Sequence, residues 1–436
     1  MSAHAAPANQ RVPLVALLAS YGSVHSSVLL FMIALPWFVL ETTGSAGQTG
    51  LATAVHGVPM VITGIFGGVI VDRLGYRRTA IISDLMSAIA FGMIPVMFLT
   101  VGLSFWMLLT LVFIGAIFDT PGFTSRLSMM PDVARRAGVR LERANSISQT
   151  LSQASILLAP ALGGILIGII GAAPVLFVTS GLLVTSTLAV LLFVPSESSR
   201  AQYSVDAKPE YLNELKRGIA FLFNTRVILA LMISVTMIQL LRAGLLVIMP
   251  VYTQVYFESA ADFGFMFAAL GGGGLVSSIL FGIWGHRWPR RAVVLVGVSS
   301  LMLTFFLLAL TPPYWMILSG LVVIGFLGGP MIPLVFTVLQ ERTPSDLRGR
   351  VFGLYDAGIF GAMVPGRLFT GYVIDFVGLI QTLLIIGGAY MLALLGIFSN
   401  RHLHQVNESA PSDDPGTEEE PGAAGRPVRT KSGGSS

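Results

Sequence analysis

Apolar runs of about 20 residues recur along almost the whole chain, and short polar stretches separate them. Each run is long enough to cross a hydrocarbon core of roughly 30 Å as an α-helix. The pattern predicts an all-α polytopic membrane protein with twelve transmembrane helices. The predicted spans cover residues 14–40, 50–71, 79–101, 104–126, 144–169, 172–194, 226–251, 263–285, 291–311, 314–339, 351–375 and 379–400.

The longest internal polar stretch, residues 195–225, separates two predicted six-helix bundles at residues 14–194 and 226–400. It contains "PEYLNELKRGIAFLF", which indicates an amphipathic helix lying at the membrane interface. Residues 1–13 form a short polar N-terminus. Residues 401–436 lack the apolar side chains that would offset the entropy of ordering, so we expect a disordered tail.

The composition agrees with a membrane protein, because 54% of the residues are hydrophobic and only 11% are charged. The chain has no cysteine, which excludes disulfides and thiolate metal sites, and its six histidines are not clustered at metal-ligand spacing. The sequence also has no paired catalytic carboxylates, nucleophile motif or phosphate-binding loop. We therefore expect neither an enzyme nor a metal or cofactor site, and no nucleic-acid partner.

Lysine and arginine residues gather in alternate loops between the predicted spans, whereas the intervening loops contain neither residue. Because positively charged loops stay in the cytoplasm, both termini are predicted to be cytoplasmic in a cell (inner) membrane protein. The basic loop residues are Arg73, Arg77, Arg78, Arg135, Arg136, Arg140, Arg143, Arg200, Lys208, Lys216, Arg217, Arg287, Arg290, Arg291, Arg342, Arg348 and Arg350.

The two halves of the chain resemble each other in sequence. "FWMLLTLVFIGAIFDTP" from Phe105 is similar to "YWMILSGLVVIGFLGGP" from Tyr314, and "MPDVARR" has a counterpart in "TPSDLRGR". A parallel repeat of two six-helix bundles places a binding site between them near the middle of the bilayer. This organisation is typical of a transporter.

A charged motif lies between the second and third predicted spans, with Gly-x-x-x-Asp-Arg-x-Gly followed by two arginines. With this motif the chain resembles the major facilitator superfamily. The resemblance implies a twelve-helix fold, alternating access and a gating role for this loop. It also implies that Asp72 caps the N-terminal end of the eleventh span when the molecule is open to the outside. The motif residues are Gly68, Asp72, Arg73, Gly75, Arg77 and Arg78.

Two further patterns resemble exporters of this superfamily. "LPWFVLETTGSAGQTGL" and "ERTPSDLRGRVFGLYDAG" are similar to the branch of enterobactin exporters and macrolide efflux proteins. The fifth span also resembles the Gly-x-x-x-Gly-Pro-x-x-Gly-Gly motif of drug–proton antiporters, with serine and alanine in place of two glycines. Close packing against Gly271–Gly274 of the eighth span is expected, and ordinary small-residue packing is the alternative. The motif positions are Ser155, Ala159, Pro160, Gly163 and Gly164.

Charged and polar side chains within the spans are candidates for substrate binding, because a charge in the membrane is costly. Arg242 and Arg367 are predicted to lie at a similar depth and to bind an anionic substrate through paired donors. Each arginine could instead bind helix carbonyl groups or extend to outer water. Other candidate substrate-binding residues are His25, Gln149, Gln153 and Gln239, for which interhelical hydrogen bonding is the alternative.

Proton coupling requires a group that can take up and release a proton within the membrane. Asp119, Asp356 and His25 are the candidates, because the central part of the first span has no acidic residue. Asp119 could instead pair with Arg73. His25 could instead form an ordinary interhelical hydrogen bond.

The leading functional hypothesis is a secondary exporter of small amphipathic or anionic molecules, such as a siderophore or a drug, driven by the proton gradient. A lipid or lysolipid flippase of the same fold is the alternative. A sensor or scaffold that does not transport is an alternative of another class. We expect a monomer whose partners are its small-molecule substrate and the lipid bilayer.

Overall fold

The computed structural model describes residues 8–196, 217, 219–344 and 347–399, without the side chains of residues 8–9, 64–70, 72–73, 286 and 349. Throughout this part of the chain the regular elements are helices. In the first half these are α1 (Ala8–Thr43), α2 (Ala46–Leu74), α3 (Tyr76–Thr100), α4 (Phe105–Arg136), α5 (Leu141–Ile170) and α6 (Ala172–Phe193). In the second half they are α8 (Arg226–Arg242), α9 (Leu245–Tyr256), α10 (Ala260–Trp284), the 3-10 turn η2 (Gly285–Arg287), α11 (Arg290–Ala309), α12 (Tyr314–Gly328), α13 (Met331–Arg342), α14 (Arg348–Val377) and α15 (Leu379–Ser399).

The helices follow the predicted spans, with two differences in continuity. The spans predicted at residues 226–251 and 314–339 are each divided into two helices, α8 with α9 and α12 with α13. In the second of these spans Pro330 lies between α12 and α13. Because proline has no backbone N–H to donate, it interrupts the helical hydrogen bonds at this point. Among the described residues, eleven segments are long and apolar enough to cross a membrane, and α2 occupies the place of the remaining predicted span.

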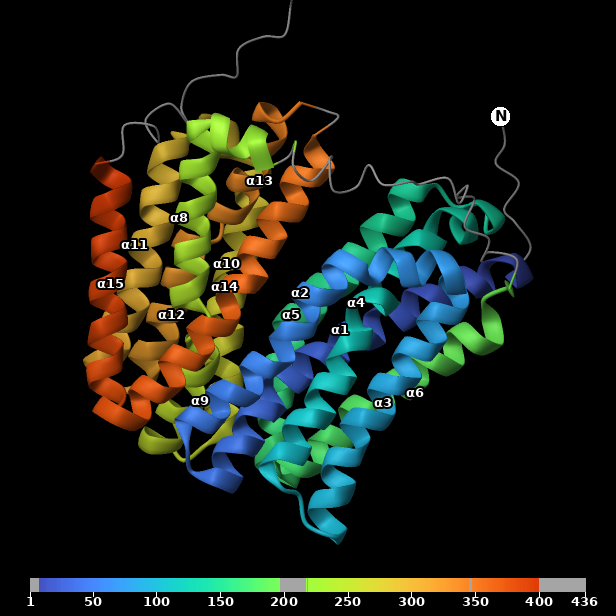
Figure 1. The fold of residues 1–436 in the computed structure, drawn as a ribbon, viewed down its shortest axis with the longest axis horizontal. Helices are drawn as coiled ribbons and strands as arrows, with labels where there is room; N and C mark the ends of the chain where they lie inside the picture. Colours follow the sequence, from blue (N-terminus) through green and yellow to red (C-terminus); the bar gives the residue numbers. More distant parts are fainter. Residues whose placement is uncertain (1–7, 197–216, 218, 345–346, 400–436) are drawn as a thin grey trace, which may run out of the picture.

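The helices form two bundles, α1–α6 and α8–α15 (Figure 1). We call one end of the bundles the basic end, because its loops are rich in arginine and include Arg77, Arg135 and Arg290. We call the other end, with the loops that lack lysine and arginine, the far end. The bundles meet toward the far end and spread apart toward the basic end, where α1 begins (Figure 1). The predicted linker helix and C-terminal tail lie largely outside the described residues.

Two helix pairs make most of the contact between the bundles: α2 with α14, and α5 with α10. Glycines allow the backbones to approach closely in both pairs. A Cβ atom on Gly371 of α14 would lie 3.1 Å from the Cα atom of Gly50 on α2, and one on Gly164 of α5 would lie 3.0 Å from the Cα atom of Gly264 on α10. These contacts lie in the halves of the helices nearer the far end. We call them the α2–α14 seam and the α5–α10 seam.

Candidate functional site

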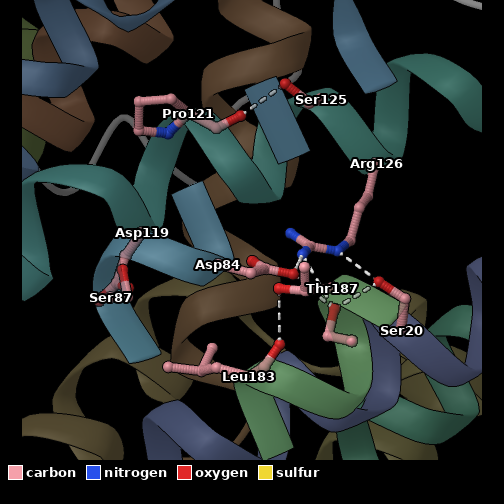
Figure 2. Close-up of polar contacts among 10 residues, drawn as sticks. Ser20, Asp84, Ser87, Asp119, Pro121, Ser125, Arg126, Leu183 and Thr187 are labelled. Carbon is pink, nitrogen blue, oxygen red and sulfur yellow. Dashed lines mark hydrogen bonds and ion pairs between the residues drawn. The ribbon is translucent and has the colours of Figure 1, made fainter. Parts of the chain in front are cut away.

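A buried ion pair lies inside the first bundle, where the sequence patterns had indicated no site (Figure 2). Arg126 of α4 pairs with Asp84 of α3, and the exposed fraction of the Arg126 residue is 0%. The Arg126 Nε atom donates to the Ser20 hydroxyl of α1 over 2.8 Å, and the Ser186 hydroxyl of α6 donates to Asp84 Oδ2 over 2.6 Å. Four helices of one bundle are therefore joined through two charges.

The sequence analysis missed Arg126 because the fourth span was predicted to end at this residue. Residue 126 was placed at the end of the fourth span, but α4 continues to Arg136, so Arg126 lies within the helix. Asp84 similarly lies inside the predicted third span. Opposite charges buried in neighbouring helices are stable together because each compensates the desolvation of the other.

A second polar group lies deeper in the same bundle, between α2, α3 and α4. The distance from His56 Nε2 to Asp119 Oδ2 is 3.7 Å, and neither atom has a hydrogen-bond partner within the described part of the chain. The other carboxyl oxygen, Asp119 Oδ1, accepts a hydrogen bond from the Ser87 hydroxyl over 3.3 Å. The rings of Phe31 and Phe91 stand beside the imidazole, with centroids 5.2 and 6.4 Å away. We call this arrangement the His56–Asp119 pair.

The other two predicted coupling residues have different surroundings. His25 of α1 is half-buried, its Nε2 atom lies 2.9 Å from the Ser152 hydroxyl of α5, and its ring is stacked on Tyr21. Asp356 is exposed on α14. His25 therefore has the interhelical hydrogen bond that was the alternative to proton transfer. Of the three candidates, only Asp119 has a side-chain polar atom, Oδ2, that is buried and without a hydrogen-bond partner among the described residues.

The predicted substrate-binding residues lie on different helices and differ in exposure. Gln149 and Gln153 are exposed on α5. Arg242, at the end of α8, is partly exposed, and its Nε atom donates to the side-chain oxygen of the buried Gln239 over 2.8 Å. This hydrogen bond leaves the remaining guanidinium donors of Arg242 for other partners, so Arg242 keeps the chemistry that an anionic ligand would need.

Arg367 lies in the α2–α14 seam, next to Gly366, which packs against the end of α8 at Leu240 and Ala243. Its exposed fraction is 4%, and its Nη1 atom donates to the backbone carbonyl of Thr53 over 2.6 Å. This is the carbonyl contact that was the alternative to substrate binding. The structure thus gives Arg242 and Arg367 different partners, and a shared two-arginine pocket stays a prediction.

The predicted gating motif is described only in part. Gly75 ends α2 with a φ of 79°, a left-handed conformation that favours glycine, and the Arg77 Nη2 atom donates to the carbonyl of Leu191 on α6 over 2.7 Å. Arg78 is exposed. The predictions for Gly68, Asp72 and Arg73 lie outside the described side chains.

The antiporter-like run on α5 packs against α10, the helix that contains the predicted partner Gly271–Gly274. Gly164 faces Gly264 of α10, and a Cβ atom on Gly264 would also contact the carbonyl of Pro160. Gly163 faces into its own bundle, where a Cβ atom would lie 3.0 Å from Leu30 Cδ2. The predicted run Gly271–Gly274 also contributes in part, because Cβ atoms on Gly271 and Gly272 would lie 3.8 and 3.2 Å from Ile156 and Leu157 of α5. Gly273 and Gly274 face α12 of their own bundle.

The described residues contain no group of three side chains that could hold a metal ion. The side chains of the site include a carboxyl group facing an imidazole, which is chemically able to exchange a proton, and an arginine whose guanidinium group is chemically able to bind an anion.

Known proteins resemble the chain over most of its length. The chain is 30% identical over 395 residues to the multidrug efflux pump Tap of Mycolicibacterium fortuitum, a match that covers 89% of this chain and 95% of Tap. It is 26% identical over 404 residues to the enterobactin exporter EntS of Escherichia coli O9:H4, covering 89% and 92% of the two chains. In structure it is similar to the nucleoside transporter NupG, with a TM-score of 0.72, 13% identity, and coverage of 91% of this chain and 100% of NupG.

A family-level match agrees with these relatives and with the two-bundle fold. The Major Facilitator Superfamily profile matches residues 17–364, which is most of the chain. The match includes the α5–α10 seam and the α2 side of the α2–α14 seam. The resemblance inferred from the charged loop motif is thereby confirmed. The chain belongs to the Major Facilitator Superfamily of membrane transporters.

Proposed function

We propose that this protein exports amphipathic or anionic small molecules from the cytoplasm in exchange for protons. The relatives named above are a multidrug efflux pump and an enterobactin exporter, which supports export of a drug or a siderophore. The observation that carries the exchange for protons is the His56–Asp119 pair, whose facing atoms are buried and have no hydrogen-bond partner among the residues that the structure describes. A carboxyl group facing an imidazole can take up and release a proton.

The proposed orientation places the basic end in the cytoplasm of a cell (inner) membrane, because arginine-rich loops are retained there. The far end then faces the outside. Because both seams lie toward the far end, the arrangement is closed to the outside and spread apart on the cytoplasmic side (Figure 1). This is the state in which an exporter takes up its substrate.

The His56–Asp119 pair is positioned to communicate with the α2–α14 seam. His56 lies on α2, and the guanidinium group of Arg367 on α14 lies beside Gly57, the neighbouring residue on the same helix. The Arg367 Nη1 atom would lie 3.5 Å from a Cβ atom on Gly57, the residue next to His56. A change in the charge of the pair therefore changes the electrostatic energy of a seam residue, which is the physical requirement for coupling.

Asp119→Asn is expected to abolish proton exchange while leaving the binding of a transported compound nearly unchanged, because the amide keeps the shape of the carboxyl group and cannot carry its proton. The measurement uses inverted membrane vesicles with an acidic interior and a pH-sensitive dye. Adding enterobactin or a macrolide to vesicles with the parent protein should release protons. With Asp119→Asn the release should fall roughly a hundredfold or more, which is the lower end of the contribution of a positioned proton-transfer group.

Asp132→Asn is the matched control, since Asp132 lies on the same helix and is exposed at the basic end beside Arg135. It should release protons at the parent rate. Proton release at the parent rate by Asp119→Asn would refute the role of the His56–Asp119 pair. Binding measured by thermal shift on the purified variants separates a loss of coupling from a loss of binding.

Arg242→Gln is expected to weaken the binding of enterobactin, an anionic catecholate, by roughly tenfold to a hundredfold, because a hydrogen bond to a charged group contributes about 1.5–3 kcal/mol. Binding of the cation ethidium should not weaken. The measurement is calorimetric titration of both compounds into purified protein. Arg226→Gln is the control, because Arg226 is exposed at the other end of α8. Equal enterobactin affinity in Arg242→Gln and the parent would exclude Arg242 from the binding site.

A further inference from the structure

An aspartate of the second bundle caps a helix of the first. Asp375, near the far end of α14, accepts hydrogen bonds from the backbone N–H groups of Ala46 and Gly47 over 2.9 and 2.8 Å. Its Oδ2 atom also accepts a hydrogen bond from the Ser45 hydroxyl over 2.7 Å. Ser45 is the N-cap residue of α2, so the Asp375 carboxylate is bound to the first turn of that helix.

The N-terminus of a helix has free N–H groups and a positive partial charge, which a carboxylate stabilises. Usually a residue of the same helix supplies this group. Here Ser45 caps the N–H of Gln48, and Asp375 of the other bundle takes the N–H groups before it. Part of the stabilisation of α2 therefore exists only while the far ends of the two bundles are together.

A second contact holds the same two helices about two turns deeper. Arg367 donates to the backbone carbonyl of Thr53, which also lies on α2. Asp375 and Arg367 are eight residues apart on α14 and therefore share one face of the helix. The negative side chain binds N–H groups of α2 and the positive one binds a carbonyl, so each charge has a backbone partner of opposite polarity.

The α5–α10 seam gives an internal comparison. It has the same close glycine approach, Gly164 against Gly264, as Gly371 has against Gly50. Asp375 lies one turn beyond Gly371, and the residue one turn beyond Gly164 is Gly168, which has no side chain and no neighbour within 4 Å of its Cβ position. The α5–α10 seam is therefore packed only by small residues at this point, whereas the α2–α14 seam is hydrogen-bonded across the bundles.

We propose that Asp375 and Arg367 form a far-end latch, which holds the outer side of the transporter closed and must break once in each transport cycle. Opening the far end separates α14 from the start of α2 and removes the cap. The predicted contact of Asp72 with the start of α14 would be the reciprocal latch at the basic end. The two helices would then cap each other at opposite ends in alternate states. The far-end latch depends on alternating access and not on the substrate or on proton coupling.

The latch can be tested by cysteine labelling, since the chain has no cysteine of its own. Val364→Cys reports on the α2–α14 seam, because Val364 Cγ2 would lie 3.4 Å from a Cβ atom on Gly57. Ala357→Cys lies two turns nearer the basic end on the same face of α14. A membrane-impermeant maleimide is added to cells for the first reporter and to inverted vesicles for the second, and the labelling rates are compared.

Asp375→Asn should raise the labelling rate of Val364→Cys from outside by roughly tenfold and lower that of Ala357→Cys from inside, because the neutral amide binds the helix N-terminus less strongly. Asp375→Glu keeps the charge and should restore most of the parent rate at both reporters. Glu41→Gln, which removes an exposed carboxylate at the far end of α1, should leave both rates unchanged.

Ser45→Gly provides a second test that is less demanding on folding, because glycine is tolerated at an N-cap while the hydroxyl donor to Asp375 is lost. It should raise outside labelling of Val364→Cys by roughly twofold to fivefold. Parent labelling rates in Asp375→Asn, in protein that elutes as a single species, would overturn the latch. If Asp375→Asn does not fold, parent rates in Ser45→Gly would overturn it instead.

Discussion

Asp84→Ala is expected to destabilise the protein by about 3–5 kcal/mol, because it leaves the buried Arg126 guanidinium without its counter-charge. Ser20 and Ser186 would remain as hydrogen-bond partners, but neither carries a charge. The measurement is the apparent unfolding temperature of purified protein in detergent, with the fraction that elutes as a single species as a second readout. Both should fall clearly below those of the parent protein.

The double variant Asp84→Ala with Arg126→Met separates a lost ion pair from a lost side-chain volume. Removing both charges leaves no unpaired charge in the bundle, so the double variant should recover most of the lost stability. Asp132→Ala is the control, because Asp132 and Arg135 form an exposed pair that contributes at most about 1 kcal/mol. A double variant less stable than Asp84→Ala would show that the pair is not the main effect.

Gly164→Val should reduce the transport rate roughly fivefold to a hundredfold, because the α5–α10 seam has no room for a side chain at this position. A Cβ atom on Gly164 would lie 2.6 Å from the carbonyl oxygen of Ala260 and 3.0 Å from the Cα atom of Gly264, and both are backbone atoms that cannot move aside alone. Overpacking of this kind costs about 1–3 kcal/mol. The closed far end would be disfavoured by that amount, which the efflux of a fluorescent substrate from cells would detect.

Gly168→Val is the matched control on the same helix. Gly168 is exposed, and its Cβ position has no neighbour within 4 Å, so the same change should leave transport near the parent rate. Equal transport by Gly164→Val and Gly168→Val would mean that the α5–α10 seam does not need to close. Reduced transport in both variants would point to a general effect of valine on α5 and would contradict the explanation from the seam.

Local patterns in the sequence were enough to predict the helices and the family. Each apolar run is long enough to span a membrane by itself, and the Gly75, Arg77 and Arg78 part of the charged motif lies within a few residues. The membership in the Major Facilitator Superfamily is confirmed by the profile match. The division of the seventh and tenth spans was missed, because a pair such as Gly329 and Pro330 can also lie in a kinked but continuous helix.

The contacts that now carry the proposals join residues far apart in the chain. Asp375 and Ala46 are 329 positions apart, and Arg126 and Ser20 are 106 positions apart. Periodicity indicates which face of a helix is apolar, but it does not indicate which helix lies opposite. For the same reason Gly271–Gly274 could be named as a packing partner of the fifth span, but the close approach of Gly264 to Gly164 could not be predicted.

The sequence by itself determined that the protein crosses the membrane many times, that its basic loops share one side, and that it is a transporter of this superfamily. These properties depend on the transfer of single segments into the bilayer and on one short motif, so each can be read locally. The tertiary structure decided that Asp119 faces His56, that Arg367 binds a helix carbonyl, and that Asp375 caps α2. A buried charge is stable only beside a suitable partner, and which partner it meets depends on how the helices pack.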